Sequence, residues 1–317
     1  MAFGLVILEL VHGVKFVMKG DKLDERDNVL IILNHRCRVD WMFYWMAVLR
    51  TGRLHNEKII MKNELKHIPG PGWCMQYLLY CFLQRKWETD RGYLERYVNY
   101  FIDAKYPLQF FLFPEGTDFD KNGKASSDRF ADKMGLPKYD YVMHPRTTGF
   151  NYLVQKTRGK VINTVYDVTL GYPVNLCYGE MDLARGNFPK EIHCFFKRYQ
   201  VDELPTEDGA LGDWCKERFA EKEERLKEFY KQKRFTGPGT EQDVTTRKQE
   251  DHANITNYIS LIFWVSFVLY SIQAVWCSSF LFWYTIIVSI IHAVISAVGG
   301  MDKTFLDLHE KEKSKQR

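Results

Sequence analysis

The seven cysteines of this 317-residue sequence form no CxxC pair, and no ligand pattern for zinc or calcium is present. An odd, unpatterned set of cysteines is typical of reduced thiols in a protein that faces the cytosol. The sequence also lacks a strong charge imbalance, because a net charge of +4 is spread through the chain. We therefore expect no disulfide framework, no metal and no nucleic acid as a partner.

The first residues lack the features of a signal peptide. Glu9, His12 and Lys15 interrupt the apolar run of residues 1–17, and no small-residue cleavage site follows. We expect an amphipathic or core-edge helix here. With 46% apolar and 15% aromatic residues, the chain can form one large domain plus an appendage.

Residues 29–50 contain the most informative pattern. Residues 29–33 predict a buried strand, and the apolar residues 41–49 predict the first turns of a buried helix. His35 and Asp40 lie between them, and in one regular helix a spacing of five would turn them about 140° apart. The spacing favours a turn in which Asp40 accepts a hydrogen bond from one imidazole nitrogen of His35 and leaves the other nitrogen basic.

Two other interpretations of this turn stay open. Asp40 could be only an N-cap of the following helix, with His35 a satisfied loop histidine. Cys37, two residues after His35, could be the nucleophile of a thiol hydrolase, although it has no separate base in the sequence.

A second strand signal, residues 108–113, ends at Pro114, which cannot continue a ladder. Glu115 and Gly116 follow at the strand end, where functional groups of mixed sheets are commonly displayed. Gly116 permits positive φ, so successive N–H groups could cradle an anion. An ordinary strand-ending turn explains the same residues.

Residues 73–83 are almost wholly apolar and run into Arg85. This arginine is either a surface charge that extends from a core element or an anion ligand at the rim of an apolar cleft. Two prolines and two glycines in residues 66–73 predict an irregular loop before this segment.

The remaining pattern predicts an alternation of strands and helices. We expect Ser126 and Ser127 to cap a helix at 128–134, and the Lys- and Glu-rich helix 207–233 to present a solvated face. Further strands are expected at 57–61, 164–170 and 191–199, a helix at 90–104, and a loop or helix start at 144–149.

Residues 252–301 contain no Asp, Glu, Lys or Arg. One helix of this length would extend about 75 Å, whereas a hydrocarbon core is about 30 Å thick. Two membrane-spanning helices, at 258–277 and 280–298, fit better, and a buried soluble hairpin is the alternative. Cations on both flanks favour a cytosolic location for both ends, and residues 313–317 resemble a lysine signal for return to the endoplasmic reticulum.

Four blocks in this order resemble the glycerolipid and lysophospholipid acyltransferase family, which acylates glycerol phosphate and lysophospholipids. Residues 34–40, 82–85, 113–117 and 144–145 carry the resemblance. Within the family they are most similar to the lysocardiolipin acyltransferase branch. Two positions depart from the pattern: Leu79 replaces a usual glycine, and Asp118 stands where Arg or Ser is common.

The resemblance implies an α/β fold, a mixed-sheet acyltransferase domain, followed by a C-terminal transmembrane helical hairpin. The predicted parts are a domain at 1–234 with its motif core at about 14–199, a polar linker at 235–251, a two-helix anchor at 252–301 and a basic cytosolic tail at 302–317. The protein would be integral to the endoplasmic reticulum or another endomembrane.

The resemblance also implies direct acyl transfer from acyl-CoA, as co-substrate, to a lysophospholipid hydroxyl, with no other cofactor and with the lipid bilayer as a partner. His35 and Asp40 would be catalytic. The implied substrate-binding residues are Asn34, Arg85, Glu115, Gly116, Thr117 and Pro145. Lysocardiolipin or lysophosphatidylinositol is the favoured acceptor; a 1-acylglycerol-3-phosphate acyltransferase and a catalytically silent lipid-binding scaffold are the alternatives. Oligomeric state is not predicted.

Overall fold

The computed structural model describes residues 8–9, 11–24, 26–49, 54–239, 242–243 and 251–315, with side chains for all of these except 242–243 and 251–257. The chain divides into two compact units, each built from two separate stretches. The first unit contains residues 1–57 and 107–248, and the second contains residues 58–106 and 249–317. Each unit is described by itself.

The first unit is built on a mixed sheet with the strand order β5-β2-β6-β7-β1-β8. Strand β2 is parallel to β5 and to β6, whereas β6 and β7 are antiparallel. The strands are β1 (Lys15–Gly20), β2 (Val29–Leu33), β5 (Gln109–Leu112), β6 (Thr164–Gly171), β7 (Glu191–Gln200) and β8 (Gln242–Asp243). Because β2 and β5 are parallel neighbours, the turns that follow them lie at the same edge of the sheet.

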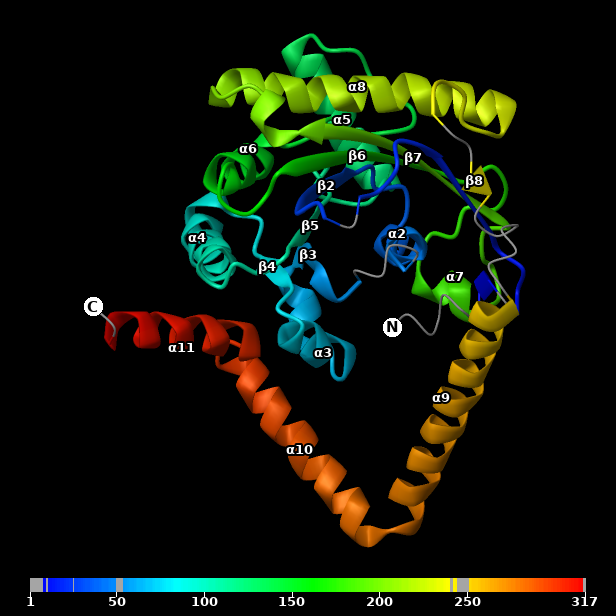
Figure 1. The fold of residues 1–317 in the computed structure, drawn as a ribbon, viewed down its shortest axis with the longest axis vertical. Helices are drawn as coiled ribbons and strands as arrows, with labels where there is room; N and C mark the ends of the chain where they lie inside the picture. The colour runs from blue at the N-terminus through cyan, green and yellow to red at the C-terminus, as the bar shows by residue number, and fades with distance from the viewer. Residues whose placement is uncertain are drawn as a thin grey trace. The chain divides into compact units, whose positions relative to one another are not determined.

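Helices pack on both faces of this sheet (Figure 1). On one face, Tyr44 of α2 stacks on Phe111 of β5, and on the other, Lys222 of α8 pairs with Asp167 of β6. The helical elements of the unit are α2 (Asp40–Val48), η1 (Leu54–Asn56), α5 (Lys121–Met134), α6 (Thr147–Thr157), α7 (Glu180–Ala184), η3 (Val201–Glu203) and α8 (Asp208–Gln232).

The predicted strands and long helices are present, and all residues of β2 and β6 are buried, as their apolar runs indicate. The expectation of an N-terminal helix at residues 1–17 is wrong from Lys15 onward, because β1 begins there and pairs with β7. Residues 1–7 and 10 lie outside the described residues.

The predicted cap of α5 is also wrong. The helix begins at Lys121, and the carboxylate of Asp120 accepts the capping hydrogen bond from Gly123 N–H. Ser127 lies inside the helix, where its hydroxyl accepts a hydrogen bond from His144 N–H, 3.0 Å away. A serine in a helix interior is compatible with such a tertiary contact.

The charges of α8 do not all face solvent. Glu223 is buried and accepts hydrogen bonds from the backbone N–H groups of Asp140, Tyr141 and Val142. Lys222 is fully buried, and its Nζ also donates to Val168 O at 2.6 Å. Burial lowers the pKa of Lys222, and the Asp167 carboxylate opposes this effect.

The second unit contains the parallel strands β3 (Glu57–Lys62) and β4 (Cys81–Leu83). The first residue of β3, Glu57, is assigned to the first unit. The helical elements of the second unit are η2 (Asn63–His67), α3 (Pro71–Tyr77), α4 (Trp87–Asp103), α9 (Asp251–Cys277), α10 (Ser279–Ala297) and α11 (Met301–Lys315). The expectation that residues 66–73 are irregular is wrong at both ends. Lys66 and His67 end η2, and Pro71 occupies the first turn of α3, where its missing N–H is tolerated.

Two helices of the second unit are long and apolar enough to cross a membrane: 258–277, within α9, and α10. Almost none of their residues is buried by the protein, and the chain reverses at Ser278. A buried soluble hairpin would instead be covered on most sides. These helices agree with the predicted pair and associate the protein with a membrane. Figure 1 shows them as the two long arms labelled α9 and α10.

We predict that Lys222→Ala destabilises the protein by about 3–5 kcal/mol, because it leaves the buried Asp167 carboxylate without its cation. The double variant Lys222→Met with Asp167→Leu should recover most of this loss. Thermal unfolding of the detergent-solubilised protein measures both effects. A double variant as unstable as Lys222→Ala would mean that the unpaired charge is not the cause.

Candidate active site

The turn between β2 and α2 brings His35 and Asp40 together. His35 Nδ1 lies 3.0 Å from Asp40 Oδ2. The Asp40 side chain is fully buried, and that of His35 is 15% exposed. Because a carboxylate can only accept, Nδ1 carries the proton and Nε2 is left as the basic nitrogen.

Asp40 is not an N-cap, so this simpler interpretation of the turn is wrong. It is the first residue of α2, and no side chain caps the helix. Its carboxylate accepts hydrogen bonds from Cys37 N–H at 2.9 Å, from Cys37 Sγ at 3.0 Å and from the Tyr172 hydroxyl. With His35, the carboxylate therefore receives four donors, which orient it toward the imidazole.

Tyr172 directly follows β6 and is a contributor that the sequence analysis missed. It is 132 residues from Asp40 in the chain, and no motif marks it. The only available signal was indirect, because a buried carboxylate needs several donors. Burial raises the pKa of the Tyr172 hydroxyl well above its usual value, so it remains a donor.

The other side of the imidazole is also held in place. The His35 ring stacks on Phe113, with 3.9 Å between ring centroids. His35 O accepts a hydrogen bond from Phe119 N–H at 2.7 Å. Ring and backbone are therefore both restrained by the segment that follows β5.

The Cys37 thiol does not have the environment of a nucleophile. Cys37 is only 1% exposed, and Sγ donates to Asp40. Burial, followed by the Asp40 charge, raises the pKa of this thiol well above its usual value. A reactive cysteine needs a lowered pKa and access, so the thiol hydrolase interpretation is not supported.

Glu115 lies in the same cluster but contacts His35 through the backbone. Its Oε1 accepts a hydrogen bond from His35 N–H at 3.2 Å, and the side chain is buried. Burial raises the pKa of Glu115 to about 8, with the nearby Asp40 charge adding to the shift and the His35 N–H opposing it. This carboxyl group therefore positions the histidine turn, which the resemblance did not predict.

Gly116 adopts a φ of 76°, the positive value that a glycine at this position permits. Its N–H donates to Phe113 O at 3.0 Å and closes the turn, so this N–H is not available to an anion. Thr117 is half-buried, and its hydroxyl donates to Asp118 Oδ1 at 3.3 Å. The anion-cradling hypothesis therefore fails for the N–H of Gly116 itself.

Asn34 and Pro145 have packing positions. The Asn34 amide is fully buried and exchanges two hydrogen bonds with the backbone of Leu170, at 2.8 and 3.1 Å. It extends the ladder between β2 and β6, and a contact of Asn34 with substrate stays a prediction. Pro145 is buried just before α6.

Arg146 is a further residue that the sequence analysis missed. A Cβ atom on Gly116 would lie 3.5 Å from Arg146 Cδ and 3.9 Å from its Cζ, so the exposed guanidinium covers this turn. Arg146 N–H also donates to Pro114 O at 2.8 Å. Arg38 lies near as well, with Nε 3.5 Å from Asp118 Oδ2. The exposed side of the turn is therefore cationic despite Asp118.

Arg85 belongs to the second unit, where it follows β4 with a φ of 64° and is exposed. Leu79, in the same unit, has a φ of 53°. This is the left-handed conformation that a glycine adopts easily. Leu79 therefore differs from the family pattern in its side chain and adopts a backbone conformation that is open to glycine.

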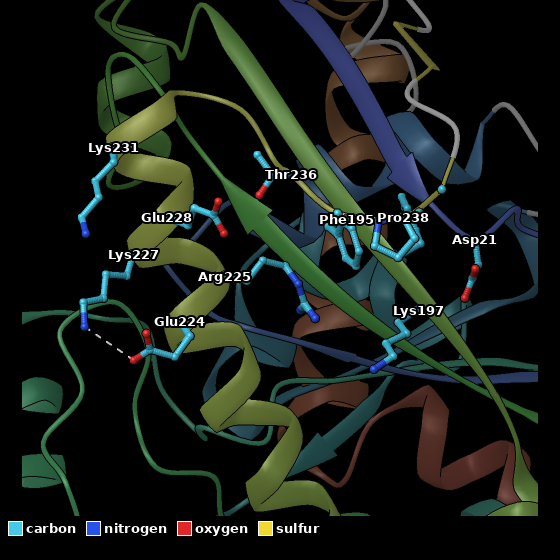
Figure 2. Close-up of a pocket in the computed structure, with 14 residues that line it drawn as sticks. Asp21, Phe195, Lys197, Glu224, Arg225, Lys227, Glu228, Lys231, Thr236 and Pro238 are labelled. Atoms are coloured by element: carbon cyan, nitrogen blue, oxygen red, sulfur yellow. Dashed lines mark ion pairs between the residues drawn. The ribbon is translucent and has the colours of Figure 1, made fainter.

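A hollow of about 730 Å³ lies elsewhere in the first unit, between α8, β7 and the turn at 236–239 (Figure 2). Charged side chains of both signs line it, among them Asp21, Lys197, Arg225 and Glu228. None of its lining residues comes from the four sequence blocks. Among the residues that the structure describes, no group of three or more His, Cys, Asp and Glu could hold a metal ion.

Comparison with known proteins agrees with this geometry. The family model described as acyltransferase matches residues 15–172, and the one described as acyltransferase C-terminus matches residues 182–264. Lysocardiolipin acyltransferase 1 of Gallus gallus is 41% identical over 99% of this chain and 83% of its own length. The chain belongs to the acyltransferase family.

Two further relatives show the range of this acyltransferase family. Lysophosphatidylinositol acyltransferase 10 of Caenorhabditis elegans is 32% identical over 100% of this chain and 84% of its own length. Probable 1-acyl-sn-glycerol-3-phosphate acyltransferase 5 of Arabidopsis thaliana is 34% identical over 76% of this chain and 64% of its own length. No solved structure matches the acyltransferase chain.

We predict that Glu115→Gln removes a pH dependence from the stability of the acyltransferase. The carboxyl pKa is 4.5 in its ordinary state and about 8 in the folded protein. Between these values the folded state binds more protons than the unfolded state, so stability should fall as pH rises and level off above the folded pKa. Glutamine keeps an acceptor for His35 N–H and does not titrate.

Thermal unfolding at a series of pH values from about 5 to 8 measures this effect, which should amount to a few kcal/mol over the interval. Wild type should lose stability more steeply than Glu115→Gln as pH rises. Parallel curves for the two proteins would show that Glu115 does not retain its proton.

Proposed function

We propose that this acyltransferase is an acyl-CoA-dependent lysophospholipid O-acyltransferase. The observation that carries the proposal is the 3.0 Å contact between His35 Nδ1 and the buried Asp40 carboxylate. It would leave Nε2 as a general base at the edge of the sheet, with the ring restrained at Nδ1 by Asp40 and by its stacking on Phe113.

In the proposed reaction, His35 Nε2 accepts the proton of a lysophospholipid hydroxyl. The oxygen attacks the thioester carbonyl of acyl-CoA, so an ester C–O bond forms and the C–S bond breaks. The imidazolium returns its proton to the thiolate of coenzyme A. Asp40 stabilises the imidazolium in between, and no acyl-enzyme is needed because Cys37 is a buried donor.

The favoured acceptors are lysophosphodiesters, such as lysocardiolipin and lysophosphatidylinositol. Relatives named for both acceptors cover nearly the whole chain. Asp118 lies in the turn that contains Glu115 and Gly116, and its negative charge would repel a phosphate monoester, which carries nearly two charges, more than a singly charged diester. A 1-acylglycerol-3-phosphate acyltransferase remains the alternative, and a panel of lysolipids distinguishes them.

Arg85 and Arg146, one in each unit, are two separate candidates for a contact with the lipid phosphate. The resemblance assigns this role to Arg85. Arg146 qualifies by position, since its guanidinium covers the Gly116 turn. A planar guanidinium matches a phosphate with two parallel hydrogen bonds. Thr117 and the backbone beyond Gly116 would orient the glycerol, and Glu115 would act through the position of His35.

We also propose a location in the endoplasmic reticulum or another endomembrane. Two crossings would return the C-terminus to the side of the catalytic unit, and the cations that flank the hairpin favour the cytosolic side for both. Acyl-CoA would then reach the enzyme from the cytosol, while the lysophospholipid remains in the bilayer.

We predict that His35→Ala lowers acyl incorporation by at least about 100-fold, because general base catalysis contributes a factor of this size. Microsomes that contain the variant are supplied with labelled oleoyl-CoA and monolysocardiolipin or lysophosphatidylinositol, and the labelled phospholipid is quantified. Cys37→Ala serves as the matched variant in the same turn and should keep most of the activity.

Two results would contradict this proposal. Equal incorporation by His35→Ala and wild type would favour a silent lipid-binding scaffold. Complete loss of activity in Cys37→Ala, with His35→Ala still active, would support the thiol hydrolase interpretation instead.

We predict that Arg85→Ala and Arg146→Ala each raise the apparent KM for the lysolipid more than the apparent KM for acyl-CoA, because each removes a phosphate contact. Lys86→Ala and Arg129→Ala remove neighbouring exposed cations and should change neither KM by a similar factor. A larger rise in the KM for acyl-CoA would exclude lipid phosphate as the ligand of the arginine concerned.

A further inference from the structure

The surface of the second unit contains an apolar segment outside the spanning helices, at residues 68–78. From Ile68 to Gln84 the chain has no Asp, Glu, Lys or Arg. Within it, Ile68, Tyr77 and Leu78 are 43%, 47% and 42% exposed. A cluster of exposed apolar side chains with no charge among them is typical of a surface that contacts another apolar phase.

This segment lies against the last turns of α10. The Tyr77 hydroxyl is 3.0 Å from His292 Nε2, and the Trp73 ring centroid is 5.3 Å from that of His292. About 8 Å of helix separates His292 from Ala297, the last residue of α10. Helix α3 is therefore beside the part of a spanning helix that occupies the boundary between acyl chains and headgroups.

Buried polar contacts fix this arrangement. Gln76 Nε2 donates to Ser296 Oγ at 3.1 Å, and Gln76 Oε1 accepts from Met301 N–H at 2.8 Å. Lys66 Nζ donates to Gly299 O at 2.7 Å and forms an ion pair with Asp302 at 3.2 Å. Because these groups are buried, α3 cannot move along α10 without leaving them unpaired.

We propose that residues 68–78 form a second membrane-contacting element that lies in the interfacial layer of the leaflet in which α10 ends. The bilayer is the partner because the segment continues the lipid-facing surface of α10. Its tryptophan and tyrosine are also the residues enriched at membrane interfaces. The inference rests on the hairpin spanning the membrane and is independent of acyl transfer.

The cysteines of the protein allow a direct test. Cys74 on α3 and Cys277 at the end of α9 are exposed. The other five are buried: Cys37, Cys81, Cys177, Cys194 and Cys215. A maleimide of the environment-sensitive dye NBD therefore labels Cys74 in the Cys277→Ser variant and Cys277 in the Cys74→Ser variant. The double serine variant gives the labelling background.

The labelled full-length proteins are reconstituted in phosphatidylcholine nanodiscs that contain lipids with a spin-label quencher near the headgroup or deep in the acyl chain. We expect the dye at Cys74 to have blue-shifted emission and to lose more fluorescence to the shallow quencher than to the deep one. Leu78→Cys in the double serine background should behave in the same way.

Two labels serve as controls. The dye at Cys277 should be quenched by lipid, since this residue ends a spanning helix. Glu217→Cys in the double serine background places the dye on the exposed charged side of α8, where neither lipid should quench it. Adding His35→Ala should leave all results unchanged, which separates this proposal from the proposed function.

Three outcomes would overturn the proposal. A dye at Cys74 as unquenched as that at Glu217→Cys would place α3 in water. A blue shift without quenching by either lipid would indicate that a second copy of the chain or another protein covers the segment. Absence of quenching at Cys277 would show that the hairpin is not in the bilayer and would remove the premise.

Discussion

The arrangement of the candidate site depends on the hydrogen bonds that the buried Asp40 carboxylate accepts. This carboxylate is fully buried, and a buried charge is stable only when donors surround it. Four donors do so: Cys37 N–H, Cys37 Sγ–H, the Tyr172 hydroxyl and His35 Nδ1–H. Three of them hold the carboxylate still, and the fourth is the imidazole whose tautomer it determines. The same hydrogen bonds that stabilise the buried charge therefore also fix the orientation of the His35 imidazole.

Sheet topology explains why two short blocks of sequence 80 residues apart act together. Strands β2 and β5 are parallel neighbours, so the turns that follow them meet at one edge. Glu115 then accepts the N–H of His35, and Phe113 stacks on its ring. Movement of either turn would break a partly buried hydrogen bond and an aromatic contact together. The base is therefore positioned by strand pairing as well as by its own carboxylate partner.

The parts of the structure that could be predicted are those with local signals. Apolar runs predicted β2, β5 and β6, and a spacing of five predicted that His35 and Asp40 meet across a turn. What could not be predicted depends on contacts remote in sequence. The hydroxyl of Tyr172, the buried pair of Lys222 with Asp167 and the guanidinium of Arg146 above Gly116 have no pattern in the chain around them. The same limit applies to the hydrogen bonds of Asn34 and Glu115, whose partners are backbone groups of distant residues.

The two departures from the family pattern, Leu79 and Asp118, differ in their structural consequences. Leu79 stands in place of glycine, yet it adopts a φ of 53°, a conformation that costs a non-glycine residue about 1–2 kcal/mol. Hydrogen bonds from Tyr97 to Leu79 O and from Lys58 to Leu78 O hold the turn in this shape. Asp118 stands where Arg or Ser is common, and the cations near it are Arg38, which pairs with it, and Arg146, whose side chain lies beside Gly116. Leu79 thus adopts a glycine-like backbone conformation at a local cost, and Asp118 lies beside cationic side chains. Under the proposed function, the Asp118 carboxylate would oppose a doubly charged phosphate more than a singly charged one, so the second departure would bear on the choice of acceptor and the first would not.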